Sequence, residues 1–163
     1  MWKKTFLVMV CLGAVVASGE TDIFGDARNA SVYFGNDAGV VDLGFTPVDK
    51  LDWGLRTMIT YDNDNVDERQ LIVDNWLVGV FVKYPFLDFS SVFPKIPIEG
   101  TTFAGVSLLY DLQSDNNFIV VPEIGVDVEV TENISARVAW QYTQRETIFD
   151  DNNTLMAGFV VRW

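Results

Sequence analysis

The last nine residues of the chain, 155–163, constrain its fold more than any other stretch. Read with a period of two, Leu155, Ala157, Phe159, Val161 and Trp163 fall on one face of a strand, and the residues between them fall on the other. An apolar face that ends on a tryptophan suits a strand that finishes at a membrane interface, where aromatic side chains gather. An ordinary half-buried edge strand would show the same alternation, so the rest of the chain has to separate the two interpretations.

The first residues predict a secretory signal peptide over residues 1–19, with cleavage near 17–19. Two lysines precede an apolar run over residues 6–16, and small residues follow, which is the order of such a signal. The run is too short for a transmembrane helix, which needs ~20 apolar residues. We therefore expect residues 20–163 to form one exported domain.

The mature chain lacks side chains on which several functions depend. Its one cysteine, Cys11, lies in the predicted leader, and the sequence contains no histidine. Disulfides, thiolate metal sites and a serine–histidine pair for acyl transfer are therefore excluded. Without the two leader lysines, nine basic residues face 23 acidic ones, a net charge of −14 that argues against binding nucleic acid. We predict no enzyme activity, no cofactor and no metal site.

Seven further runs alternate with a period of two and, with the last stretch, predict eight strands. The predicted strands cover residues 30–34, 41–45, 52–61, 76–84, 104–110, 123–129, 135–142 and 155–163. Short second-to-third and sixth-to-seventh connections alternate with longer polar loops, as in outer-membrane barrels. The long connector from Pro85 to Gly100 breaks this rule, and the sequence suggests only a plug or a periplasmic contact for it.

The aromatic residues sort by strand end once the chain is given an up-and-down path. Phe34, Tyr61, Trp76, Tyr110 and Tyr142 fall where strands enter loops, whereas Phe45, Trp53, Tyr84 and Trp163 fall where strands meet turns. Two aromatic girdles of this kind are typical of transmembrane barrels. Because no backbone donor can stay unpaired in hydrocarbon, the first strand must pair with the last. We predict an all-β, eight-stranded antiparallel up-and-down transmembrane β-barrel.

The strand faces opposite the large apolar residues carry glycine and charge, and these faces predict the barrel interior. An eight-stranded barrel is just wide enough to be filled by its own side chains. Buried charges need partners, so four inward cations and five inward anions predict a charge-paired lumen network and no open channel. The predicted network consists of Asp42, Asp52, Arg56, Lys83, Glu123, Asp127, Glu129, Arg137 and Arg162.

Residues 121–128 and 131–142 resemble the paired late strands of the OmpA-like and OmpX-like eight-stranded barrels of Gram-negative bacteria. The ending over residues 156–163 is similar to theirs as well. The resemblance implies an outer-membrane location with both termini in the periplasm and no peptidoglycan-binding domain. It also implies contact with outer-membrane lipid and lipopolysaccharide, and insertion by barrel-assembly machinery that recognises the C-terminal strand. It describes architecture more than activity.

Three roles stay open for such a barrel. The first is a non-enzymatic structural or surface-interaction role, with loops 62–74, 111–117 and 144–153 contacting a partner that the sequence does not identify. The second is a narrow porin-like channel for ions or small solutes, whose conductance would rise when a pairing of Arg137 with glutamate is broken. The third is a secreted soluble β-barrel that binds an apolar ligand, which requires the large apolar faces to point inward. Residues 62–68 resemble the opening of a calcium loop but lack its glycine and its closing glutamate, so a solvated acidic loop is expected and a weak divalent-cation site is the alternative.

Overall fold

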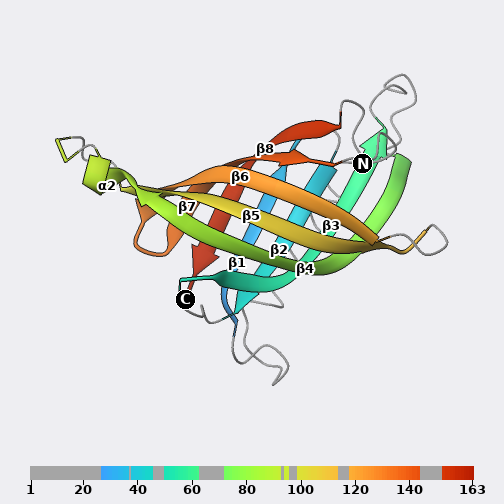
Figure 1. Ribbon diagram of the computed structural model, residues 1–163, viewed down its shortest axis with the longest axis horizontal. Helices are drawn as coiled ribbons and strands as arrows, with labels where there is room; N and C mark the ends of the chain where they lie inside the picture. The colour runs from blue at the N-terminus through green and yellow to red at the C-terminus, as the bar shows by residue number, and fades with distance from the viewer. Residues whose placement is uncertain are drawn as a thin grey trace.

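The computed structural model describes residues 27–36, 38–45, 50–62, 72–92, 94–95, 99–113, 118–143 and 152–163, so the predicted signal peptide lies outside it. Eight antiparallel strands form one closed barrel in the order of the sequence (Figure 1). The elements are β1 (Ala27–Phe34), β2 (Ala38–Phe45), β3 (Asp52–Asp62), β4 (Ile72–Asp88), α2 (Phe89–Val92), β5 (Gly100–Asp111), β6 (Phe118–Thr131), β7 (Ile134–Tyr142) and β8 (Asn153–Arg162). Within the described residues, no helix has both the length and the apolarity to cross a membrane.

The barrel closes between its first and last strands. β1 and β8 pair antiparallel from Asn29 opposite Arg162 to Phe34 opposite Ala157. The N–H of Trp163 then donates to the carbonyl oxygen of Arg28 at 3.1 Å, so the pairing continues to the last residue of the sequence. Closure pairs the backbone groups along this seam, as a strand surrounded by hydrocarbon requires. The predicted closed up-and-down barrel is confirmed.

The barrel has two different ends. The turn end holds the β2–β3, β4–β5 and β6–β7 connections, together with the start of β1 and the end of β8. The loop end holds the β1–β2, β3–β4, β5–β6 and β7–β8 connections. These two names are used below for the ends of the barrel.

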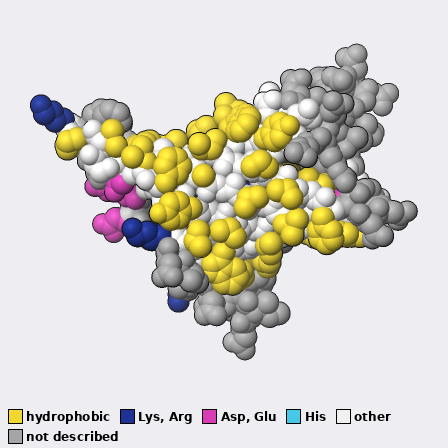
Figure 2. Space-filling model, in the orientation of Figure 1, with side chains coloured by type: hydrophobic (Ala, Val, Ile, Leu, Met, Phe, Trp, Pro, Cys, Tyr) yellow, Lys and Arg dark blue, Asp and Glu magenta, His cyan; other side chains and the backbone are white. Residues whose placement is uncertain are grey.

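Large apolar side chains cover the outside of the barrel, and they are 37–66% exposed (Figure 2). They include Trp53, Leu55, Trp76, Val80, Val82, Val106, Leu108, Phe118, Val120, Ile124, Val138, Trp140, Leu155, Phe159 and Val161. Soluble monomers rarely expose so much continuous apolar surface, whereas a membrane barrel needs it for lipid contact. The prediction that these faces point outward is confirmed. It is the reverse of what a soluble barrel with an internal apolar ligand requires.

Most strands are longer than the sequence predicts, and β4, β5 and β6 exceed their predicted lengths the most. β4 continues through Pro85 to Asp88, and β6 begins at Phe118, so Pro122 lies inside β6 and not near its start. Pro85 is tolerated because β3 pairs with β4 only as far as Lys83, which leaves that edge without a partner strand. The described part of the Pro85–Gly100 connector extends from the turn end, outside the lumen (Figure 1), so these residues do not form a plug, and a periplasmic contact stays a prediction.

Candidate functional site

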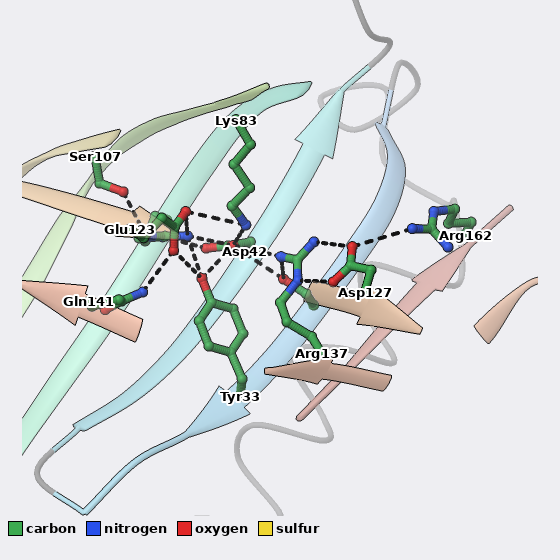
Figure 3. A network of polar contacts seen from close by, with 11 residues as sticks. Tyr33, Asp42, Lys83, Ser107, Glu123, Asp127, Arg137, Gln141 and Arg162 are labelled. Carbon is green, nitrogen blue, oxygen red and sulfur yellow. Dashed lines mark hydrogen bonds and ion pairs between the residues drawn. The ribbon is translucent and has the colours of Figure 1, made fainter. Parts of the chain in front are cut away.

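The lumen is the candidate site, and its centre holds two carboxylates and two cations (Figure 3). Asp42 of β2 lies directly opposite Arg56 of β3. Arg56 donates from Nε to Asp42 Oδ1 at 2.7 Å and from Nη2 to Oδ2 at 2.8 Å. Arg56 Nη2 also lies 2.9 Å from Glu123 Oε1, and Lys83 Nζ lies 2.6 Å from Asp42 Oδ2. Four strands therefore meet in one set of charge-assisted hydrogen bonds.

Neutral polar side chains complete the hydrogen bonds of this centre. The Tyr33 hydroxyl accepts from Arg56 Nη2, donates to Asp42 Oδ2 at 2.9 Å and lies 3.4 Å from Glu123 Oε2. Ser107 Oγ accepts from Arg56 Nη1 at 2.6 Å. Gln141 Nε2 donates to Glu123 Oε2 at 3.0 Å. Satisfying the remaining polar atoms of buried ions in this way lowers the cost of removing them from water.

A second cluster lies nearer the turn end. Arg137 of β7 lies opposite Asp127 of β6 and donates to it through one edge of the guanidinium, from Nε to Oδ1 at 2.7 Å and from Nη2 to Oδ2 at 2.8 Å. Arg162 Nη1 donates to Ser135 Oγ at 2.6 Å, and its Nη2 lies 3.5 Å from Asp127 Oδ2. Arg137 thus pairs with an aspartate, and the expectation of a glutamate partner is wrong. Its Nη1 lies 3.8 Å from Asp42 Oδ2, which joins the two clusters.

Aromatic rings surround the inward cations. Lys83 Nζ lies 4.5 Å from the centre of the Phe81 ring, 5.4 Å from that of Phe103 and 5.5 Å from that of Tyr33. The Arg137 guanidinium carbon lies 4.7 Å from the Phe103 ring centre. Cation–π attraction is stronger at desolvated sites, so these rings stabilise the charges that they enclose.

The predicted network residues divide into a sealed set and three residues at its margin. Three cations and three anions are sealed, with residues between 1% and 7% exposed: Arg56, Lys83, Arg137, Asp42, Glu123 and Asp127. The Arg162 side chain is 40% exposed. Asp52 is half-buried, and Glu129 is exposed on β6. Neither Asp52 nor Glu129 forms an ion pair with another described residue. The structure therefore brings together seven of the nine predicted residues.

The lumen is apolar on the loop-end side of the charged centre. Val40 pairs with Met58 one inward position closer to the loop end than the Asp42–Arg56 pair. This apolar layer consists of Val40, Met58, Leu77, Leu109, Ile119 and Val121, all buried. Charged groups thus fill the lumen toward the turn end, and the apolar layer lies between them and the loop end. The buried polar residues Thr60, Asp111, Thr143 and Thr154 lie closest to the loop end.

Gly105 gives the charged centre the space that it needs. A Cβ at this position would lie 2.9 Å from Lys83 Cγ and 3.0 Å from Glu123 Oε1. Gly105 lies opposite both of these residues in the sheet register, on β5 between β4 and β6. A side chain here would therefore displace at least one member of the ion network.

The predicted girdle residues lie at the two ends as follows. At the loop end Phe34 and Trp76 are exposed, Tyr61 donates to the carbonyl oxygen of Gly35, Tyr110 packs on Phe118, and Tyr142 stacks on Trp140. At the turn end Phe45 packs on Trp53 with ring centres 5.0 Å apart, and Tyr84 and Trp163 are exposed. Tyr84 is not the last residue of its strand, because β4 continues beyond it.

The polar groups of the lumen are largely engaged with one another. The hydroxyls of Ser107 and Ser135 accept hydrogen bonds from guanidinium groups. The Ser31 hydroxyl donates to Asp42 Oδ2 at 3.2 Å, and Arg56 binds both oxygens of that carboxylate. A cavity of about 180 Å³ opens at the turn end and is lined by Asp52, Lys83, Pro85, Thr101, Phe103, Asp127, Arg137 and Arg162. Among the described residues, no three side chains of the metal-binding types gather. The geometry supports a filled lumen.

Sequence reasoning missed Tyr33 and the apolar layer. Tyr33 shares its inward face with Ser31, and its neighbour Phe34 faces outward. The outward position of Phe34 at the loop end was enough to predict that its neighbour Tyr33 faces inward. Met58 and Leu109 lie on the face opposite the outer apolar residues, so the apolar layer could have been predicted from them. The sequence prediction considered only the charged residues of that face.

No protein-family model and no curated protein matches the sequence. Solved structures match the fold. The designed transmembrane barrel TMB2.3 superposes with a TM-score of 0.56 at 10% identity, over 84% of this chain and 94% of that one. Another de novo designed transmembrane β-barrel gives 0.52 at 13% identity, over 85% and 96%. Neisserial surface protein A gives 0.50 at 15% identity, over 84% and 95%.

These likenesses concern the fold alone, because every identity is low. They agree with the closed strand order and with the apolar outer surface. The chain has the fold of an eight-stranded transmembrane β-barrel.

Proposed function

We propose that this protein is a non-enzymatic barrel of the Gram-negative outer membrane, with a structural or surface-interaction role carried by its loop end. The observation that carries the proposal is the combination of an apolar outer surface with a lumen filled by ion pairs and hydrocarbon. A barrel whose lumen is filled acts through its loops and through its contacts with lipid. Fold-level likeness to a surface protein supports this role by analogy.

The partners follow from the same proposal. Outer-membrane lipid covers the apolar belt, and lipopolysaccharide surrounds the loop end. The barrel-assembly machinery binds β8, whose outer face carries Leu155, Phe159 and Val161 and leads to Trp163. A surface partner contacts the loops over residues 62–74, 111–117 and 144–153, most of which lie outside the described residues.

Single cysteines test the location and the orientation together, because the predicted mature chain has no cysteine of its own. Gln113→Cys marks an exposed position at the loop end, and Glu132→Cys marks an exposed position in the β6–β7 turn. With both termini in the periplasm, a membrane-impermeant maleimide added to intact cells labels position 113 and spares position 132 until the outer membrane is permeabilised. Labelling of position 132 alone would reverse the orientation, and recovery of the protein in the periplasmic fluid would refute the location.

A narrow channel is the second candidate function. The turn-end cavity favours it, since water can enter the lumen there as far as Lys83 and Arg137. The apolar layer opposes it, because ions cross a filled hydrocarbon segment poorly. Planar-bilayer recordings of the purified barrel decide between the two functions: an absence of conductance steps supports the filled barrel, and regular single-channel steps establish the channel.

A further inference from the structure

The turn end carries an extension that we call the tongue, formed by residues 84–92, 99–103 and 127–131. β3 stops pairing with β4 at Lys83, but β4 continues to Asp88 and leads into α2. β5 and β6 continue beside it, with Leu87 opposite Thr102 and Gly100 opposite Val128. Figure 1 shows this three-stranded extension projecting from the barrel with α2 at its tip. The barrel wall is therefore taller on this side than elsewhere.

The free edge of the tongue is not suited to pairing with another strand. Pro85 has no backbone N–H, and the β4–β5 register shifts between Pro85 and Leu87. A proline, a bulge and a charged residue such as Asp88 are the features by which proteins protect open sheet edges. Phe89 of α2 covers Gly100, where an added Cβ would lie 2.9 Å from the ring. A partner would therefore meet the face of the tongue and not its edge.

The two faces of the tongue differ in polarity. Tyr84 and Leu87 share the outward face of the barrel strands and are exposed. The apolar side chains of Phe86, Val92 and Val130 in the same extension are exposed as well. The inward face carries Thr101, Asp127 and Glu129, and it forms one wall of the turn-end cavity. Figure 2 shows hydrophobic side chains running from the barrel onto this extension. The tongue thus repeats the polarity of a lipid-facing barrel wall.

The length of β4 matches the full thickness of a bilayer. Its 17 residues at ~3.3 Å each extend ~56 Å, which becomes ~40 Å along the membrane normal at a tilt of ~45°. The hydrocarbon core needs only ~9–11 residues of such a strand, whereas the bilayer with its headgroups measures ~40–45 Å. The residues of the tongue are the surplus, so they reach the headgroup region. Lys95, exposed beyond α2, adds a cation suited to lipid phosphates.

We propose that the outer face of the tongue binds the lipid interface at the turn end, among headgroups and the first acyl carbons of one leaflet. The occupant is phospholipid because the apolar face of the tongue continues the lipid belt without interruption along β4. The tongue then anchors the barrel laterally and fixes its rotation relative to that leaflet. This inference rests on the proposed membrane location and adds a specific lipid-contact surface to it.

Two adjacent residues provide a matched test. Val130 is apolar, 62% exposed and lies at the register shift of β6, whereas Glu129 lies opposite the buried Ser135 and is also exposed. The mature chain carrying Val130→Cys or Glu129→Cys is labelled with an environment-sensitive fluorophore and folded into 3:1 phosphatidylcholine–phosphatidylglycerol vesicles. Spin-labelled lipids with the nitroxide near the headgroup or deep in the acyl chain serve as membrane quenchers, and iodide serves as the aqueous quencher. Slower mobility on boiling confirms that each variant is folded.

The label at position 130 is expected to be quenched at least twofold more by the shallow lipid than by the deep lipid, and more than the label at position 129. The label at position 129 is expected to respond to iodide. Equal iodide quenching at both positions would place the tongue in water, and resistance of position 130 to all quenchers would place it against protein; either result overturns the inference. A label at the mid-wall position Val106→Cys must be quenched by the deep lipid, and its failure would refute the membrane location itself.

Discussion

Removal of the Arg56 guanidinium tests the charge network most severely. Arg56 binds both oxygens of Asp42, and it contacts Glu123 at 2.9 Å and Ser107 at 2.6 Å. Arg56→Met keeps much of the side-chain volume and leaves two sealed cations against three sealed anions. Asp42 retains Lys83 at 2.6 Å, but the nearest cation left to Glu123 is Lys83 at 3.7 Å.

Breaking a buried ion pair by removing one partner costs about 3–5 kcal/mol, because the remaining charge is buried without compensation. We expect Arg56→Met to lower the free energy of unfolding by that amount. The control is Arg162→Met, which removes the same group from a side chain that is 40% exposed. A solvated ion pair contributes at most about 1 kcal/mol, so this variant should stay close to the wild type.

Urea titration of the barrel folded in lipid vesicles, followed by tryptophan fluorescence and by gel mobility without heating, measures both variants. Adding Glu123→Gln to Arg56→Met restores equal numbers of sealed cations and anions and should recover about 1–3 kcal/mol. Equal stability of Arg56→Met and Arg162→Met would contradict a buried ion network. So would a double variant whose loss of unfolding free energy equals the sum of the losses in Arg56→Met and Glu123→Gln alone.

Three further outcomes follow from the structure. Gly105→Val should destabilise the barrel by about 1–3 kcal/mol in the same urea assay, because the new Cβ meets Lys83. The control Ala104→Val on the lipid-facing side should be nearly neutral. Equal losses in the two variants would contradict a role of Gly105 in making room for the ion network. Arg137→Met should still give no conductance in planar bilayers, because the apolar layer remains. Conductance steps in this variant would show that the apolar layer does not block ions by itself. Trp163→Ala should reduce the amount of folded barrel in cells and leave folding into vesicles nearly unchanged, and equal loss in both would limit Trp163 to a lipid contact.

Alternation along each strand predicts which residues face lipid, because the side-chain period of two is imposed by the backbone. It cannot predict which inward residues meet, since contact across the lumen depends on register and stagger between strands. Asp127 and Glu129 share one face, yet only Asp127 lies opposite Arg137. Tyr33 reaches Arg56 and Glu123 only once the barrel is closed.

The end of β4 could not be predicted for a related reason. A proline cannot donate to a ladder, so Pro85 was the natural point to end the strand. Whether a missing donor matters depends on whether a neighbour strand lies on that side, and β3 has already ended there. The residues of the tongue can be read from the sequence around Pro85. That Pro85 lies at an open sheet edge is known only from the strand pairing.

Quenching of tryptophan fluorescence by brominated lipid tests the central claim most directly. All four tryptophans of the predicted mature chain, Trp53, Trp76, Trp140 and Trp163, are 42–49% exposed on the outer surface. In vesicles of brominated phosphatidylcholine the emission of the folded barrel should fall by more than half, and aqueous acrylamide should quench it weakly. Strong quenching by acrylamide together with no response to brominated lipid would contradict a barrel whose large apolar side chains face the membrane.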